Sequence, residues 1–407
     1  MGMIRVVILG QGMVASHLAV GIERIKQGEV EPYGVPLASI ELPYKVEDIE
    51  IVRSYDVDES KVGKSLYKVC SKLLGNSTKI PSTLKDVYVS RGIHMGSMDG
   101  MPIKVKGLED KVSIDDAITA MLDDFKSDNV DVIVNLITTE YGEPLNNVAK
   151  LRSSFTDGVK RQLTASQIYA YVASEYSRLY KSIAFVNGIP IPLANDQAYV
   201  DLYKEDGGVL LGDDGATGAT PLTADLLEHL AERNRRVKFI VQFNIGGNTD
   251  FLALTLPKKN LMKELTKSSI VEDILGYDAP HYIKPTGYLK PLGDKKFVSM
   301  HIEYLSFNGF KDEIYVEARI NDSPAMAGSV VDMIRMAKIA VDKGHKGTIY
   351  PVNVFFMKKP GPPRSKSIAK ILAYYHLLKW LYDNGVITLS SLPETTREYI
   401  QTINFSG

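Results

Sequence analysis

A short apolar segment that ends in a glycine-rich turn constrains this chain more than any other feature of its sequence. Residues 4–9 are mostly apolar and rich in β-branched side chains, which is typical of a buried parallel strand. The next residues read Gly10-Gln11-Gly12-Met13-Val14-Ala15-Ser16, and a helical apolar pattern follows them. This is the G-x-G-x-x-A form of the dinucleotide-binding loop, in the strand–turn–helix setting that the motif needs.

Each small residue of this loop has a separate physical task. Gly10 permits the tight turn, Gly12 lets the backbone approach a pyrophosphate, and Ala15 keeps the helix close to the strand. Free N–H groups and a partial positive charge at the helix N-terminus favour bound phosphates. We therefore expect an NAD-type dinucleotide to be held by Gly10, Gly12, Met13, Val14, Ala15 and Ser16.

A second strand pattern supports this expectation. Residues 49–56 read as a strand that ends in Asp56. A carboxylate at that position accepts hydrogen bonds from ribose hydroxyls and disfavours a 2′-phosphate, so it predicts NAD over NADP. The spacing from Gly10 exceeds the usual ~20 residues, because residues 28–47 read as an inserted loop. The alternative is that Asp56 only caps the following turn.

Two further strand patterns end in polar side chains. The runs at residues 131–139 and 183–190 are apolar and carry Asn135, Thr138 and Asn187 toward their carboxyl ends. Ligands of doubly wound sheets bind at those ends. These three residues are therefore candidate cofactor contacts, and the alternative is that each one only satisfies its own loop.

Charge and composition exclude several classes of protein. The 407 residues include 48 Lys and Arg against 49 Asp and Glu, whereas non-specific nucleic-acid binders carry a basic excess. The single cysteine, Cys70, excludes an intrachain disulfide framework and a zinc site of several thiolates. No apolar run reaches the roughly 18 residues of a membrane span, and no signal-peptide layout is present. We expect a cytoplasmic enzyme that binds neither nucleic acid nor membrane.

The pattern changes in the second half of the chain. Strand patterns that follow one another without intervening helices indicate a mainly antiparallel sheet in a second domain. These strands are expected at residues 237–243, 281–283, 297–305 and 313–320. The same half predicts helices at residues 260–275, 325–343 and 367–383, and a further strand at residues 347–357.

Lysines stand out in this half. Lys263 and Lys267 are four residues apart in a predicted helix, so they share one face of it. Lys296 lies in a turn, and Lys358 closes the strand predicted at residues 347–357. Cationic groups at the ends of elements suit the binding of an anionic substrate and the stabilisation of oxyanions. The alternative for the helical pair is a solvated basic face.

Taken in order, these motifs resemble the myo-inositol-1-phosphate synthase family over nearly the whole chain. No single segment is decisive, but their order and their spacings, such as the 13 residues from Asp250 to Lys263, are specific. The matching segments are 10–16, 55–58 with 61–64, 131–136, 185–190, 211–214, 247–250, 263–268, 293–296, 321–324 and 350–358.

The resemblance implies a reaction and a cofactor. Members of the family convert D-glucose 6-phosphate to 1D-myo-inositol 3-phosphate, also called L-myo-inositol 1-phosphate, and regenerate NAD within each turnover. The sugar is oxidised at C5, enolised at C6, closed by attack of C6 on the C1 aldehyde, and reduced again at C5. The net reaction is therefore an isomerisation.

The resemblance also implies roles for the lysines. It places Lys263, Lys267, Lys296 and Lys358 around the substrate. We expect Lys263 and Lys358 at the C5 oxygen, and Lys267 and Lys296 at the phosphate or the C1 oxygen. Preorganised ammonium groups stabilise the negative charge that develops on such oxygens. A buried lysine crowded by cations also has a lowered pKa, which suits acid–base work near neutral pH.

Carboxylates and a phosphate site complete what the resemblance implies. Asp214, Asp250 and Asp322 occupy the positions that orient the lysines and move protons, and Asp214 and Ser323 are also cofactor contacts. The substrate phosphate, which has been proposed to act as the base at C6, is expected to bind Thr217, Gly218, Thr220, Asn248 and Lys267.

The chain departs from the family directly after its double aspartate. Relatives commonly carry a Lys-Ser pair there, whereas this chain has Gly215-Ala216-Thr217, which puts the length and chemistry of the phosphate site in question although Thr217 keeps a hydroxyl. Some members need a divalent and others a monovalent cation. The aspartates could serve as ligands, but no histidine cluster indicates a permanent metal site. Members are usually homotetramers, which we expect here by analogy.

The order of these motifs along the chain also predicts the architecture. We expect an α/β fold with a doubly wound Rossmann-type NAD-binding domain formed by residues 1–216 and 323–407. An α+β domain for catalysis and oligomerisation, residues 217–322, is inserted between the two parts and is built on a largely antiparallel sheet.

Two other functions stay open. A related two-domain dehydrogenase of the homoserine or aldehyde type would release NADH, and the phosphorylating aldehyde type needs a nucleophilic thiolate. Cys70 lies in a helical stretch at residues 66–74, so we expect it in the core. The other alternative is an inactive NAD-binding scaffold, which would be expected to lose buried lysines because they are costly without a substrate.

Overall fold

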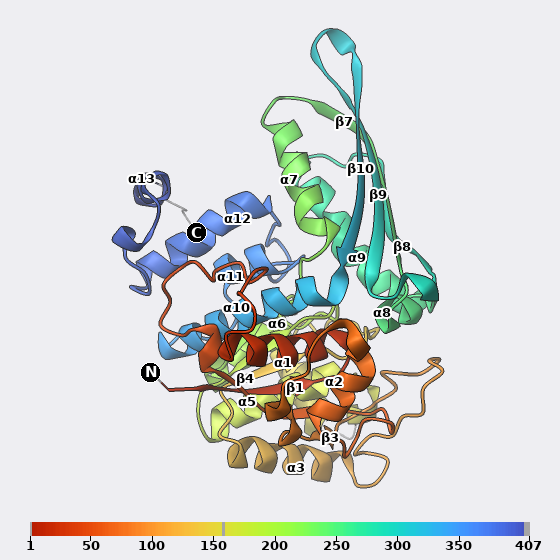
Figure 1. The fold of residues 1–407 in the computed structure, drawn as a ribbon, viewed down its shortest axis with the longest axis vertical. Coiled ribbons are helices and arrows are strands. Elements are labelled where there is room, and N and C mark those ends of the chain that lie inside the picture. The colour runs from red at the N-terminus through yellow and green to blue at the C-terminus, as the bar shows by residue number, and fades with distance from the viewer. Residues whose placement is uncertain (1, 157–158, 403–407) are drawn as a thin grey trace.

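The fold is organised by two sheets. The computed structural model describes residues 2–156 and 159–402. The first sheet has six parallel strands in the order β3-β2-β1-β4-β5-β6 (Figure 1). These strands are β1 (Ile4–Leu9), β2 (Ile49–Asp56), β3 (Val89–Arg91), β4 (Val132–Asn135), β5 (Ala184–Asn187) and β6 (Val209–Leu211). The strand order reverses between β1 and β4, which is where doubly wound sheets bind ligands.

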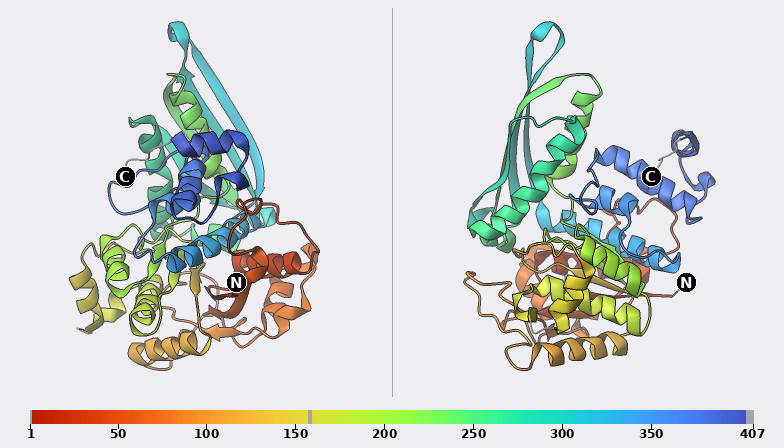
Figure 2. Two further views of the ribbon diagram at one scale, coloured as in Figure 1. Left: turned by 90° about the vertical axis from the view of Figure 1, so that its left-hand side faces the viewer. Right: turned by 180° about the vertical axis from the view of Figure 1, so that it is seen from behind.

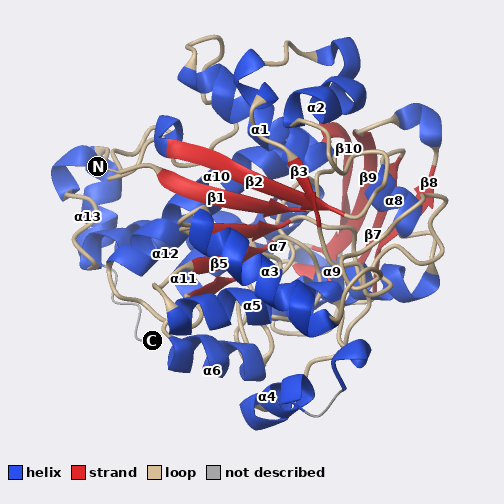
Figure 3. Ribbon diagram, turned by 90° about the horizontal axis from the view of Figure 1, so that it is seen from below, coloured by secondary structure: helices blue, strands red, loops and turns tan. Residues whose placement is uncertain are grey.

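Helices cover both faces of the first sheet, as its fully buried central strands require. Val6 and Ile8 of β1 pack on one side, and Val7 and Leu9 pack on the other. Figure 3 shows the strands lying between these two helix layers. One layer holds α1 (Met13–Lys26), α2 (Leu66–Leu74) and α10 (Asp322–Asp342). The other holds α3 (Ile114–Ser127), α4 (Val148–Thr156), α5 (Ala165–Leu179) and α6 (Gln197–Asp206). The doubly wound fold predicted from the sequence is therefore confirmed.

The second sheet has four strands in the order β10-β9-β7-β8. They are β7 (Arg236–Gly246), β8 (His281–Tyr288), β9 (Lys295–Leu305) and β10 (Lys311–Asn321). The pairings of β9 with β7 and β10 are antiparallel, and β7 with β8 is parallel, so the sheet is largely antiparallel as expected. One face packs on α7 (Ala219–Ala231) and α9 (Pro257–Leu275), and the short α8 (Thr249–Ala253) lies at one end. Figure 2 shows the β9–β10 hairpin projecting from the rest of the molecule.

The chain returns to the first sheet after the second. Helix α10 directly follows β10 and packs against α1 in the core beside β1. Helices α11 (Tyr350–Phe356), α12 (Lys370–Asp383) and α13 (Glu394–Thr402) complete the chain on the same side. This order of elements is compatible with a second domain inserted into the first. The expected domain boundaries at residues 216/217 and 322/323 remain a prediction. Within the described residues, no helix has the length and apolar character needed to cross a bilayer.

The strand predicted at residues 347–357 is wrong, because most of this segment forms α11. Pro351 lies in the first turn of that helix, where a missing N–H has no consequence and the fixed φ of proline is already helical. Val352, Val354 and Phe356 are all buried, so apolar residues do not fall on one face and the helical period is hidden. Lys358 thus follows a helix and not a strand.

Candidate active site

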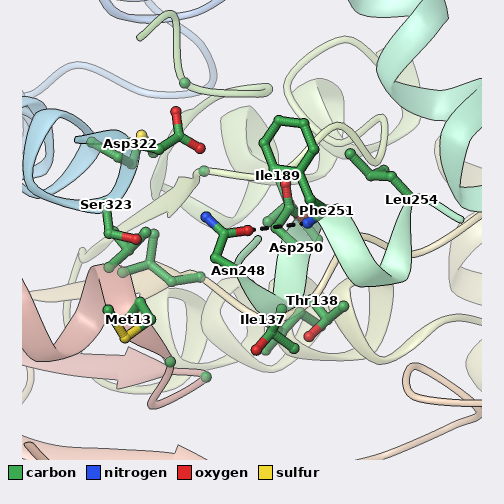
Figure 4. A pocket seen from close by; sticks show the side chains of 18 of the residues that line it. Met13, Ile137, Thr138, Ile189, Asn248, Asp250, Phe251, Leu254, Asp322 and Ser323 are labelled. Carbon is green, nitrogen blue, oxygen red and sulfur yellow. Dashed lines mark hydrogen bonds between the residues drawn. The ribbon is translucent and has the colours of Figure 1, made fainter. Parts of the chain in front are cut away.

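One cavity of about 300 Å³ lies between the glycine loop of the first sheet and the lysines of the second half of the chain. Gly10, Gly12, Met13 and Val14 line one part of it. Residues from the opposite part include Lys263, Lys296, Lys358, Asp214, Asp250 and Asp322. Segments far apart in the sequence therefore meet at a single site, and Figure 4 shows Met13, Asn248, Asp250, Asp322 and Ser323 around it.

The glycine loop has the geometry of a phosphate cradle. Gly10 has a φ of +90°, and a Cβ there would lie 2.7 Å from the backbone of Ile137, so only glycine fits. Gly12 is the N-cap of α1, and as a glycine it has no side chain that could cap the amides of the helix. A Cβ on Gly12 would meet nothing within 4 Å, so space is open beside the free amides of the first helical turn. A dinucleotide pyrophosphate fits this arrangement.

Asp56 lies at the end of β2 and lines the cavity beside this loop. Its carboxylate accepts hydrogen bonds from the backbone N–H of Gln11 at 2.9 Å and from those of Val57 and Asp58 at 2.8 Å. Lys61 Nζ donates to the same carboxylate at 2.9 Å. Asp56 therefore caps the following turn and also faces the cavity, and its lysine partner was not foreseen from the sequence.

Two of the predicted cofactor contacts, Asn135 and Asn187, lie outside the cavity lining and take part in a buried hydrogen-bond network. Asn135 and Asn187 are fully buried and do not line the cavity. The Asn135 amide donates to Asn187 Oδ1 and to Ser166 Oγ at 3.0 Å, and the Asn187 amide donates to Asp213 Oδ1 at 2.7 Å. This network fixes the ends of β4 and β5 below the cavity.

Of four other predicted cofactor contacts, two line the cavity and two do not. Thr138 and Ser323 line the cavity. Ala15 and Ser16 are buried behind the loop, where Ser16 Oγ accepts a hydrogen bond from Gln11 Nε2 at 3.2 Å. These two residues therefore support the loop from within and do not contact the cavity.

Asp214 is the centre of the charged part of the site. Its fully buried carboxylate accepts hydrogen bonds from Lys263 Nζ at 3.0 Å and Lys358 Nζ at 2.8 Å. Thr266 Oγ1 donates to it at 2.6 Å, a contact that no sequence pattern indicated. The three charged side chains come from the loop after β6, from α9 and from the residues after α11.

In this arrangement the two lysines have different pKa values. Burial alone would raise the pKa of Asp214, but Lys263 and Lys358 outweigh it and hold the pKa well below its usual range. Burial lowers the pKa of Lys263, but Asp214 and Asp250 raise it above the ordinary lysine value. Burial lowers the pKa of Lys358 to about 8; Asp214 opposes this shift, and nearby Lys263 adds to it. Lys263 is thus a permanent cation, whereas Lys358 can exchange a proton near neutral pH.

A second ion pair lies beside the start of α7. Lys296 Nζ donates to Asp322 Oδ1 at 2.5 Å, and Lys296 holds the pKa of Asp322 below its usual value although burial acts in the opposite direction. Gly218 is the N-cap of α7, and a Cβ there would lie 2.5 Å from Lys296 Nζ. Thr217 and Thr220, next to it in the sequence, line the cavity. Lys296, two hydroxyls and a helix N-terminus therefore gather where a phosphate can bind.

Asn248 is hydrogen-bonded to Asp294, a residue that the sequence analysis did not single out as part of the site. Asn248 Oδ1 caps α8 by accepting from the Phe251 N–H at 3.1 Å, the bond drawn in Figure 4. Its amide donates to Asp294 Oδ1 at 2.9 Å, and Ser323 Oγ donates to the same oxygen at 2.6 Å. Asp294 therefore holds Asn248 and the first turn of α10 together.

Asp250, Lys267 and the metal-ligating side chains complete the description of the charged part of the site. Asp250 lies 3.8 Å from Lys263 and accepts a hydrogen bond from Thr139 Oγ1 at 3.0 Å. Lys267 belongs to α9, but its side chain is outside the described residues. Among the side chains that are described, no cluster of three or more metal-ligating groups occurs.

The thiol of Cys70 is not placed for chemistry. It is fully buried between α2 and the glycine loop, where Gln11 Nε2 lies 3.9 Å from it. Burial raises its pKa to about 11, so the thiol stays protonated at neutral pH. The core position predicted for Cys70 is confirmed, and this disfavours the aldehyde dehydrogenase alternative.

Asp214→Asn tests whether the buried carboxylate holds the lysines in place. The variant leaves two buried ammonium groups without their shared anion, so we expect the free energy of unfolding at pH 7 to fall by about 3 kcal/mol. Because the pKa of Asp214 is lowered in the fold, its stabilisation is present at neutral pH and is lost only in acid.

Urea unfolding of Asp214→Asn and of the matched variant Asp250→Asn measures this difference. The carboxylate of Asp250 is more exposed and lies farther from Lys263, so its loss should cost less than about 1 kcal/mol. Equal losses in the two variants would contradict a special role for Asp214.

Comparisons with known proteins identify relatives of this chain. The family model described as myo-inositol-1-phosphate synthase matches residues 218–323. Inositol-3-phosphate synthase of Mycolicibacterium smegmatis is 28% identical over 386 residues, which cover 91% of this chain and 96% of that protein.

Two solved structures are also similar to the chain. The crystal structure of a myo-inositol-1-phosphate synthase-related protein from Thermotoga maritima is 52% identical and covers 95% of this chain and 99% of its own, with a TM-score of 0.88. Inositol-3-phosphate synthase from Caenorhabditis elegans is 14% identical and shares the fold with a TM-score of 0.76, covering 100% of this chain and 90% of its own. The chain is a member of the myo-inositol-1-phosphate synthase family.

Proposed function

We propose that this protein is an NAD-dependent isomerase that converts D-glucose 6-phosphate to 1D-myo-inositol 3-phosphate. The observation that carries the proposal is that a dinucleotide-type glycine loop and the Asp214–Lys263–Lys358 cluster line one cavity. A cofactor and an anionic sugar bound there would be neighbours. The names of the relatives, inositol-3-phosphate synthases among them, support the same reaction.

The residues that would hold NAD are those of the glycine loop and its surroundings. The amides at the start of α1 would bind the pyrophosphate, and Asp56, which lines the cavity, would accept hydrogen bonds from the ribose. Thr138, Asp214 and Ser323 face the cavity farther along. Bound NAD would supply a hydride acceptor for the first step and a hydride donor for the last.

Lys263 and Lys358 are assigned to the C5 oxygen. When the C5 hydroxyl becomes a carbonyl, its proton passes to the neutral amine of Lys358, and the same ammonium returns it when C5 is reduced again. Lys263 remains charged and stabilises negative charge on that oxygen throughout. Asp214 keeps the two amines at fixed positions.

The phosphate and the C1 aldehyde are assigned to the other end of the site. Thr217, Thr220, Asn248 and the N-terminus of α7 beside Gly218 bind the phosphate, which takes the proton from C6. Lys296, oriented by Asp322, neutralises the C1 oxygen as C6 attacks the aldehyde. The expected role of Lys267, whose side chain lies outside the described residues, stays a prediction, and Asp250 would assist Lys263 in holding its charge.

We further propose a cytoplasmic homotetramer, in keeping with the family. The second sheet supports self-association, because its face away from α7 and α9 carries large exposed side chains. These include Phe243, Tyr282 and Tyr315, of which Tyr315 is 66% exposed. In the part of the chain that the structure describes, the long edge strand β10 pairs with β9 alone, so a partner could cover it.

A product assay with a matched variant tests the reaction. Wild-type protein given D-glucose 6-phosphate and NAD should form inositol phosphate, seen by phosphorus NMR, with no net NADH. Lys263→Ala should abolish turnover, because the permanent cation at the C5 oxygen is lost, and should leave the affinity for NAD nearly intact. Activity of that variant within about threefold of wild type would contradict its role. NADH that accumulates with the substrate would favour the dehydrogenase alternative.

The pH dependence of turnover tests the role of Lys358. Its lowered pKa of about 8 means that the neutral, proton-accepting fraction rises from about one tenth at pH 7 to about nine tenths at pH 9. We expect kcat/KM to rise across this range. Lys358→Arg, which stays protonated, should lose about 100-fold or more in kcat/KM and should lose this rise. An unchanged profile in the variant would assign the proton transfer to another group.

A further inference from the structure

A long segment between β3 and α3 closes one side of the cavity. This covering segment comprises residues 92–108, and Figure 1 draws the β3–α3 connection as a long loop that extends away from the first sheet. Ile93, Ser97, Met98 and Ile103 line the cavity from it. The segment therefore forms part of the wall beside the expected cofactor position.

Both ends of the covering segment are tied to the cofactor-binding end of the first sheet. The Gly92 N–H donates to the carbonyl of Asp56 at 3.0 Å, and the Lys106 N–H donates to the carbonyl of Val57 at 2.9 Å. Between these ends the chain turns back on itself, with positive φ at Met95, Gly96 and Gly100. The ends are therefore fixed beside Asp56, and the middle needs a separate attachment.

Helix α9 and its N-cap residue, Leu256, supply that attachment from the opposite side of the cavity. Lys259 Nζ donates to the carbonyl of Ser97 at 2.5 Å. Leu256 packs against Gly100, where a Cβ would lie 3.1 Å from Leu256 Cδ1. The covering segment thus spans from the end of β2 to the first turn of α9.

Lys259 has no part in the proposed chemistry, although it is only 7% exposed. It lies one helical turn before Lys263, does not line the cavity, and has Glu140, Asp250 and Asp99 as the acidic groups around it. Burying a lysine is costly unless its ammonium group is well bonded. The hydrogen bond from its ammonium group to the Ser97 carbonyl attaches the covering segment to α9.

We propose that Lys259 is a positioning residue that holds the covering segment across the bound dinucleotide and thereby slows its departure. This inference rests on the proposed function. In that reaction the cofactor ends each turnover in the redox state in which it began, so no exchange is needed between turnovers. A covering segment that is attached on both sides of the cavity suits a cofactor that stays bound through many turnovers.

Cofactor retention can be measured directly on the purified protein. NAD dissociation is followed by stopped-flow dilution or displacement, in wild type, Lys259→Met, and the control Lys258→Met. Lys258 is the exposed neighbour, whose ammonium lies over the Tyr141 ring and not on the covering segment. We expect dissociation at least about fivefold faster in Lys259→Met, equal to wild type in Lys258→Met, and partly restored in Lys259→Arg.

A second readout is independent of the cofactor. Hydrogen exchange of the amides of residues 93–105 should become faster in Lys259→Met and in Leu256→Ala, which loosens the other attachment without removing a charge. Faster exchange with an NAD dissociation rate within twofold of wild type would overturn the inference and leave the proposed function standing. Wild-type protein that binds no NAD would overturn both.

Discussion

The carboxylate of Asp214 is the interaction on which the site depends. It is fully buried and binds two ammonium groups and one hydroxyl. Three buried charges are tolerable only because each has a bonded partner. The carbonyl of Asp214 also accepts a hydrogen bond from the N–H of Lys358 at 2.8 Å, so backbone and side chain fix the same lysine. The loop after β6, α9 and the chain after α11 are thereby joined at one point.

This single carboxylate also separates the properties of two chemically identical side chains. Lys263 is stabilised as a cation by Asp214 and Asp250, whereas Lys358 is buried among further cations and has a lowered pKa. A reaction that moves a proton on and off an oxygen, and must neutralise charge on that oxygen, needs both kinds of amine. In the proposed reaction, Lys358 would therefore act as the acid–base group and Lys263 as the electrostatic group.

Much of the fold could be predicted because local signals and tertiary structure agree. The glycine loop after β1, the strands of the second sheet, and helices α9, α10 and α12 follow from periodicity and turn residues. Helix α11 was mistaken for a strand because its apolar side chains are buried on several sides and hide the period. The lysines and aspartates were found through a family resemblance and not through spacing alone.

The residues that were missed act through tertiary contacts that leave no local pattern. Thr266 bonds Asp214 from another element, Asp294 bonds Asn248 and Ser323, and Lys259 reaches a carbonyl 162 residues away. Asn135 and Asn187 show the converse case. Their positions at strand ends suggested ligand contacts, but the two amides bond to each other below the cavity. A position at a strand end does not by itself reveal whether an asparagine side chain faces a ligand or is hydrogen-bonded within the protein.

In the proposed reaction, one bound nicotinamide and one cluster of amines act in turn on the same carbon of a sugar phosphate. D-glucose 6-phosphate carrying deuterium at C5 tests this most directly, with the label followed by mass spectrometry and NMR. We expect each inositol phosphate molecule to keep the deuterium on the carbon that carried it. Loss of the label to water, or its appearance in released NADH, would contradict the account.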